Sequence, residues 1–206
     1  MYSNQHPTRR LLIETAAELL ESESPDSLTV DMVLIKSGVS KGSLYHHFDD
    51  FSDLVETVLV RLFVKSVDNN ADLIRNVIDQ STDLASLIAG LRAVTQATQN
   101  ESQRATRFRR ARLLSFAERK PRLMARMAIE QARLTAAYAE LFAICQQRGW
   151  FKPDFSPHAA AVFIQAYTLG KIVDDVTEDR MNPADWDNLI MQIVAKVFVA
   201  ETGQAA

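Results

Sequence analysis

The chain has 206 residues, 47% of them hydrophobic and 24% charged, with a net charge of −3, which is ordinary for a soluble protein of one or two domains. No apolar run approaches the roughly 18 residues of a membrane span, and the N-terminus lacks the apolar stretch of a signal peptide. The single Cys145 excludes an internal disulfide and a multi-cysteine zinc site, so we expect a cytoplasmic protein without a membrane partner.

Apolar residues recur at helical spacing along almost the whole chain, and no segment alternates as a strand does. This pattern predicts an all-α protein of about nine helices with short connections. Capping residues, prolines and glycines place the helices at about 8–23, just after Thr29, from Ser40 to near Phe48, from Asp49 or Asp50 past Val67, from Ser81 or Thr82 through Leu91, at about 102–117, from Pro121 to Gly149, and at about 157–178 and 183–201.

Residues 29–48 read TVDMVLIKSGVSKGSLYHHF and predict two short helices joined by a tight turn. Gly38 suits that turn because glycine adopts a positive φ without strain. This arrangement is a helix-turn-helix, whose second helix enters the major groove of DNA. Its first turn offers backbone N–H groups to phosphates, lets the DNA backbone come close, and is followed by side-chain donors for phosphates and base edges. The candidate DNA-binding residues of this helix are Ser40, Lys41, Gly42, Ser43, Tyr45, His46 and His47.

The stretch SGVSKGSLYHHF, set between one helix and a longer one, resembles the DNA-binding domain of TetR-type transcriptional repressors over about residues 8–60. The resemblance implies a helix-turn-helix domain at residues 1–50 and a helical domain for ligand binding and dimerisation at residues 51–206. It also implies a homodimer on a palindromic DNA operator, released by a small molecule. It places Thr29 near a phosphate, Leu44 and Phe48 in the core, and DNA contacts at Lys41, Ser43, Tyr45 and His46.

The sequence departs from the family directly after this motif. The family commonly has a lysine that grips a phosphate, and here Phe51 stands in its place, within the acidic stretch Asp49-Asp50-Phe51-Ser52-Asp53. Carboxylates repel phosphate, so this stretch predicts weaker operator binding, which Arg9 and Arg10 could offset in part.

A ligand pocket is expected among the helices between about residues 82 and 148. The family resemblance supplies part of this expectation, and the sequence adds flexible and aromatic side chains that suit an apolar cavity, namely Phe108, Phe116, Met124, Met127, Tyr138 and Phe142. The ligand is then largely apolar, and an anionic one requires an arginine turned inward, for which Arg104 and Arg112 are the candidates. A solidly packed core without a cavity is the alternative.

The last two predicted helices carry apolar stripes wide enough for a dimer interface as well as for packing within the chain. Two such helices from each of two subunits form a four-helix bundle. The predicted interface residues are Phe163, Ala166, Gly170, Val173, Trp186, Leu189, Ile190, Ile193 and Val197.

Two arginine-rich segments admit more than one interpretation. The arginines between 104 and 112 point all round their helix, which favours a solvated surface or a basic patch. Arg119, Arg122, Arg126 and Arg133 share one stripe with Glu130, which indicates either a solvated charged face with i, i+3 and i, i+4 pairs or arginines that meet an anionic ligand.

Two other functions remain open. Asp174 and Asp175, followed by Glu178 and Asp179, could hold Mg²⁺ in an all-α enzyme acting on a diphosphate, although without a second facing cluster the string is expected to be a solvated helix end. A helix-turn-helix protein that no longer binds DNA is the other alternative. No catalytic residue, metal site or cofactor is predicted, and Cys145 is expected to be a buried filler.

Overall fold

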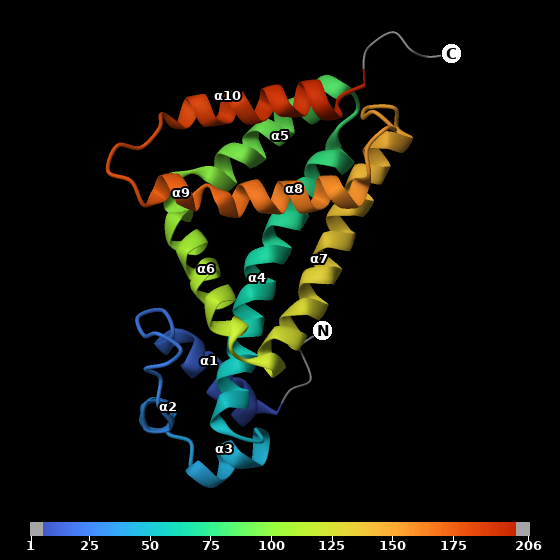
Figure 1. The fold of residues 1–206 in the computed structure, drawn as a ribbon. Coiled ribbons are helices and arrows are strands. Elements are labelled where there is room, and N and C mark those ends of the chain that lie inside the picture. Colours follow the sequence, from blue (N-terminus) through green and yellow to red (C-terminus); the bar gives the residue numbers. More distant parts are fainter. Residues whose placement is uncertain (1–5, 201–206) are drawn as a thin grey trace. The chain divides into compact units, whose positions relative to one another are not determined.

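The computed structural model describes residues 6–200, which form ten α-helices, a 3₁₀ turn at Glu101–Gln103, a π-helical turn at Val194–Phe198 and no β-strand (Figure 1). The all-α prediction is confirmed, and the helix beyond the expected nine is the short α9, Ile172–Asp175. No helix within these residues is long and apolar enough to cross a membrane.

Contacts between residues divide the chain into two compact units. The first unit contains the described residues up to Lys65 together with Ser115–Met127, and the second contains Ser66–Leu114 and the described residues from Ala128 onward. Three helices supply residues to both units: α4 (Phe51–Gln80), α6 (Arg104–Glu118) and α7 (Pro121–Gln147).

The first unit is built on α1 (Pro7–Leu19), α2 (Val30–Ser37), α3 (Lys41–His47) and the first half of α4. Helix α1 packs against both α2 and α3. Helix α1 ends earlier than expected, at Leu19 rather than near Glu23, and the side chains of Ser24 and Ser27 close a hydrogen-bonded turn around Pro25. The core of the unit consists of Leu12, Ile13, Ala16, Val33, Leu44, Phe48, Leu54 and Val58.

The helix-turn-helix forms as the sequence predicts. The Thr29 hydroxyl accepts a hydrogen bond from the Met32 backbone N–H and caps α2. Gly38 ends α2 with φ of +69°, in the left-handed region that glycine adopts without strain. Ser40 then caps α3 by accepting from the backbone N–H of Ser43. These three residues set the angle between α2 and α3 locally.

The second unit adds α5 (Leu84–Gln99), α8 (Pro157–Gly170), α9 and α10 (Pro183–Ile193). Ser156 and Asn182 cap α8 and α10 ahead of first-turn prolines, as expected. The expected cap of α5 is wrong, because Asp83 and Ser86 form a capping box there while the Ser81 hydroxyl donates to a backbone carbonyl at the end of α4. Figure 1 shows α5 running beside α10.

The core of the second unit is rich in aromatic rings. Phe142, Phe151, Phe155 and Phe198 lie with ring centroids 5.0–6.4 Å apart, and offset or tilted rings at this spacing attract one another. Cys145 is buried among them, and burial raises the pKa of its thiol to about 11. The thiol is therefore protonated at neutral pH and acts as the expected core filler.

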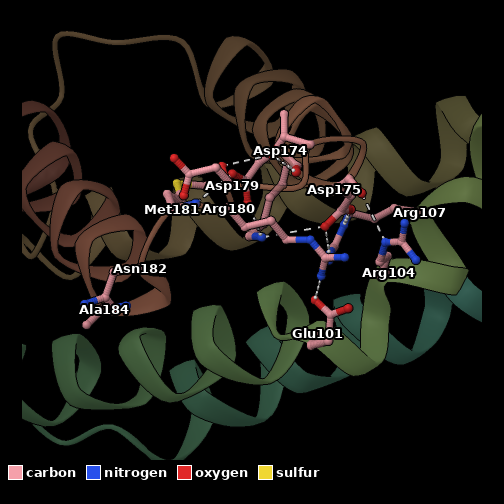
Figure 2. Close-up of polar contacts among 12 residues, drawn as sticks. Glu101, Arg104, Arg107, Asp174, Asp175, Asp179, Arg180, Met181, Asn182 and Ala184 are labelled. Atoms are coloured by element: carbon pink, nitrogen blue, oxygen red, sulfur yellow. Dashed lines mark hydrogen bonds and ion pairs between the residues drawn. The ribbon is translucent and has the colours of Figure 1, made fainter.

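A buried ion pair joins α6 to α9 (Figure 2). Arg107 is 4% exposed and donates from Nε and Nη2 to the two carboxylate oxygens of the fully buried Asp175. Arg104 donates to the backbone carbonyl of Asp175, and the ammonium of Lys171 lies 3.7 Å from its carboxylate. The prediction that 174–179 is a solvated helix end is therefore wrong at Asp175, and the prediction that the α6 arginines are a solvated face is wrong at Arg107.

The same contacts bear on the enzyme alternative. Asp175 is committed to Arg107, and Asp174 accepts from the Met181 backbone N–H and contacts Lys171. The diphosphate-enzyme hypothesis thus lacks its carboxylate pair. Throughout residues 6–200, no group of three or more His, Cys, Asp or Glu side chains is placed to hold a metal ion.

Candidate DNA interface, cavity and dimer surface

Helix α3 presents one polar face and one buried face. Lys41, Gly42, Tyr45 and His46 are exposed, and Ser43 is half-buried. Leu44 is buried in the first unit, as is Phe48 directly after the helix. The predicted DNA-contact residues therefore share the accessible side of α3. A Cβ built on Gly42 would meet nothing within 4 Å, so this position leaves open space on that side.

Three imidazole rings gather at the end of α3. The His47 ring lies 4.8 Å from the ring of His6, which caps α1, and 5.1 Å from that of His46. Burial and the neighbouring positive charges of His6, His46 and Arg9 lower the pKa of His47. His47 is therefore neutral at pH 7 and serves as a hydrogen-bonding group rather than as a fixed charge.

The acidic stretch after α3 is paired with arginines from the start of α7. Arg122 contacts Asp50 at 3.2 Å and Glu56 at 2.7 Å, and Arg126 contacts Asp53 at 3.0 Å. Asp50 also caps α4 by accepting from the backbone N–H of Asp53, and these contacts lower the pKa of Asp50. Asp50 and Asp53, two of the three carboxylates of this stretch, are thus offset by cations of the same unit.

These contacts bear on the interpretation of the α7 arginine stripe, because Arg122 and Arg126 pair with carboxylates of the chain itself. Of the predicted pairs within α7, Arg133 with Glu130 forms at 3.0 Å, whereas Arg126 turns to α4 instead. The partial compensation of DNA binding expected from Arg9 and Arg10 stays a prediction. Arg9 lies over the Phe48 ring and Arg10 faces Glu14.

The second unit encloses a cavity of about 80 Å³ lined from α4, α5, α7, α8 and the end of the chain's last helical segment, with Arg110 from α6. On this measure a single water needs about 10–15 Å³, so the cavity holds several waters or a small organic molecule. Most lining residues are apolar, and the polar ones are Thr95, Thr98, Arg110, Tyr138, Gln165, Tyr167 and Thr168.

Two of the six predicted ligand residues, Tyr138 and Phe142, line this cavity. Phe108 lies beneath the Arg104 guanidinium and Phe116 beneath the Lys120 ammonium. Met127 is buried in the first unit, and Met124, expected on the apolar face of α7, is 40% exposed. The prediction treated the apolar residues of α6 and α7 as one group, but both helices pass from one unit into the other.

The cavity also contains residues that the sequence did not single out. Arg110 faces it, whereas the candidates for an inward arginine do not line it: Arg104 is bonded to Asp175 and Arg112 is exposed. Gln165 lines it from α8. A glutamine within the apolar stretch AAAVFIQAY was the one available sign of a buried polar site.

The predicted dimer residues fall into two classes. Phe163, Ala166, Gly170, Val173, Leu189 and Val197 are exposed, with Val173 at 73% and Val197 at 50%, and they are joined by exposed Val162 and Val176. Ile190 is a correction, because it is 3% exposed and belongs to the core of its own unit. Trp186 and Ile193 also pack partly against that core. The apolar faces of α8 and α10 thus remain accessible only in part.

Comparison with known proteins agrees with the assignment of the helix-turn-helix. Residues 12–58 match the family of bacterial regulatory proteins of the tetR family. The chain is 18% identical to the HTH-type transcriptional regulator UidR of Escherichia coli (strain K12), with 97% of each chain covered.

Solved structures share the fold over nearly the full length. A TetR-family transcriptional regulator from Mesorhizobium loti MAFF303099 aligns with a TM-score of 0.71 and 18% identity, covering 94% of this chain and 97% of its own. Salmonella enterica GusR aligns with a TM-score of 0.69 and 17% identity, covering 94% and 96%. A transcriptional regulator from Saccharomonospora viridis in complex with choline aligns with a TM-score of 0.66 and 16% identity, covering 95% and 100%.

Proposed function

We propose that this chain, which is a TetR-type DNA-binding transcriptional regulator, is a homodimeric repressor that leaves a palindromic operator when a small molecule fills the cavity of its second unit. The observation that carries the proposal is the pairing of two features: a correctly capped helix-turn-helix with a polar accessible face, and a lined cavity in the unit that shares α4, α6 and α7 with it.

The DNA contact is assigned to α3. Lys41 and Tyr45 are exposed and are proposed to hold phosphates, while Ser43 and His46 are proposed to reach base edges. The arginine pairs at Asp50 and Asp53 support this assignment, because they reduce the repulsion that these carboxylates would exert on phosphate.

The dimer is assigned to the exposed apolar residues of α8 and α10. Contiguous apolar surface on a soluble protein commonly marks an interaction site, and small residues such as Ala166 and Gly170 permit close approach of two helices. A two-fold dimer would present two α3 helices to half-sites roughly 34 Å apart, or a multiple of that spacing.

The proposed effector mechanism is based on the helices α4, α6 and α7, which supply residues to both units. A ligand among α4–α8 of the second unit acts on helices that also build the first unit. It weakens DNA binding only if it prefers the dimer whose α3 helices are wrongly spaced for the operator.

A gel shift with the DNA upstream of the protein's own gene tests this proposal. We expect a retarded band that competitor DNA of unrelated sequence does not abolish. Absence of any specific band would instead support the alternative of a helix-turn-helix protein that no longer binds DNA.

A further inference from the structure

Arg110 brings a positive charge to the cavity of the second unit. Among the cavity-lining residues in the described part of the chain it alone carries a charge. Its neighbours Arg109 and Arg112 on α6 are exposed. Burial lowers the pKa of the Arg110 guanidinium, because the charged form loses hydration. An oxyanion beside it would favour the charged form and add charge-assisted hydrogen bonds.

A network of neutral side chains positions this guanidinium. Arg110 donates from Nη2 to the amide oxygen of Gln131 at 3.4 Å, and Gln131 donates to the amide oxygen of Gln165 at 2.6 Å. Gln165 in turn donates to the hydroxyl of Thr135 at 3.1 Å. The network links α6, α7 and α8, so a ligand meets a guanidinium that is already hydrogen-bonded on one side, which reduces the ordering cost of binding.

The two lining phenols, Tyr138 and Tyr167, do not neutralise this charge, because burial raises the pKa of both. Burial raises the pKa of Tyr138 to about 12, so its hydroxyl stays protonated at pH 7 and offers a neutral hydrogen-bonding group. The remaining wall includes the rings of Phe142, Phe151 and Phe198. One cavity therefore combines a cation and neutral phenols with an apolar wall of aliphatic side chains and three phenylalanine rings.

We propose that the effector is a small weak acid, an apolar or aromatic body that carries a carboxylate, and that its anion pairs with Arg110 while its body packs on the phenylalanine rings. This inference rests on the proposed function, because it names the ligand class of the same cavity. It also corrects the expectation that Arg104 or Arg112 supplies the inward cation.

Isothermal titration calorimetry on the full chain tests the ligand class with two matched probes, 3-phenylpropanoate and 3-phenylpropanamide. The two differ in charge and hardly in shape. We expect the acid to bind about 10- to 100-fold more tightly, the ratio that hydrogen bonds to a charged group provide. Arg110→Met should abolish the preference, whereas Arg109→Met, a change of the same kind at an exposed position of α6, should retain it.

The comparison of acid with amide on the unaltered protein decides the proposal even if Arg110→Met does not fold. Equal or tighter binding of the amide, or no binding of either probe at millimolar concentration, would overturn it. Retention of the preference by a folded Arg110→Met variant would overturn the assignment to Arg110. These measurements use no DNA, so a failed gel shift contradicts the proposed function alone. Acid binding that leaves a DNA complex intact supports the ligand class and contradicts the effector role.

Discussion

At the scale of single residues, the carboxylates after α3 show how neighbouring arginines reduce the repulsion between an acidic side chain and DNA. Asp50, Asp53 and Glu56 would repel DNA if they stood alone, yet each lies within 4 Å of Arg122 or Arg126. Glu56 depends most on its arginine partner. It is 3% exposed, and burying a carboxylate costs free energy unless it is paired.

Replacing Arg122 with glutamine removes a partner from both Asp50 and Glu56. We expect the free energy of unfolding to fall measurably, but by less than the usual loss for a fully buried pair, because Arg122 is half-exposed. Urea denaturation measures the change. Arg119→Gln, at an exposed position just before α7, should change stability by less than about 0.5 kcal/mol. Equal losses in the two variants would contradict the role given to this pair.

Lys41→Ala tests the phosphate contact assigned to the start of α3. We expect weaker binding to all DNA sequences, with the slope of log affinity against log salt reduced by about one, because one phosphate contact is lost. Fluorescence anisotropy at several salt concentrations gives that slope. Lys65→Ala removes the same charge from an exposed position in the middle of α4 and should leave it unchanged. An unchanged slope in Lys41→Ala would refute the contact.

At the scale of helices, the Arg107–Asp175 pair fixes the start of α6 to α9 within the second unit (Figure 2). The helix α9 has only four residues, and Lys171, Asp174 and Asp175 supply the polar contacts around it. Both members of the pair are buried, so each depends on the other for charge compensation.

A double-mutant cycle measures that dependence. Arg107→Met and Asp175→Leu should each lower the free energy of unfolding by about 3–5 kcal/mol, since each deprives a buried charge of its two-point partner. The double variant should lose less free energy of unfolding than the two single losses added together, because both buried charges of the pair are removed at once. Additive losses in urea denaturation would show that the two residues do not compensate one another.

The pair also gives stability a defined pH dependence. Arg107 lowers the pKa of Asp175 below its ordinary value of 3.8. The stabilisation is therefore complete above about pH 4 and is lost as the pH falls through the lower pKa of the folded protein. Unfolding measured between pH 7 and pH 3 should show a smaller acid loss in the double variant than in the unaltered protein. An equal loss in both would contradict this assignment.

At the scale of the whole molecule, DNA recognition by the proposed dimer requires that α8 and α10 meet a second copy. Their exposed apolar residues would be buried by that contact, while Ile190 is already in the core. A variant that tests the dimer must therefore change an exposed position and leave the core intact.

Leu189→Glu meets this condition, since Leu189 is 49% exposed on α10. We expect light scattering to show a monomer at tens of micromolar, because an unpaired carboxylate would be buried at the interface. Ile129→Glu introduces the same charge at a 70% exposed position of α7 and should stay dimeric. Circular dichroism checks that both variants are folded. If the Leu189→Glu variant stays dimeric, the interface lies elsewhere.

The local parts of this protein could be predicted from the sequence because their causes are local. Thr29, Gly38 and Ser40 act on residues within a turn of themselves, as do Pro157 and Pro183, so the helix-turn-helix and the all-α fold followed from short-range patterns. The polar residues of α3 were recognisable for the same reason, although their DNA contacts remain a prediction.

Only the tertiary structure decided which charges pair and which residues share a cavity. Arg122 and Glu56 are 66 residues apart, and Arg107 and Asp175 are 68 apart. Neither pair can therefore be recognised from short-range spacing in the sequence. Helical periodicity gives one face for Met124, Met127, Tyr138 and Phe142, but it cannot show that α7 passes from one compact unit into another. Arg110 faces the cavity where Arg109 and Arg112 are exposed, and its partner Gln131 lies on another helix, 21 residues away along the chain.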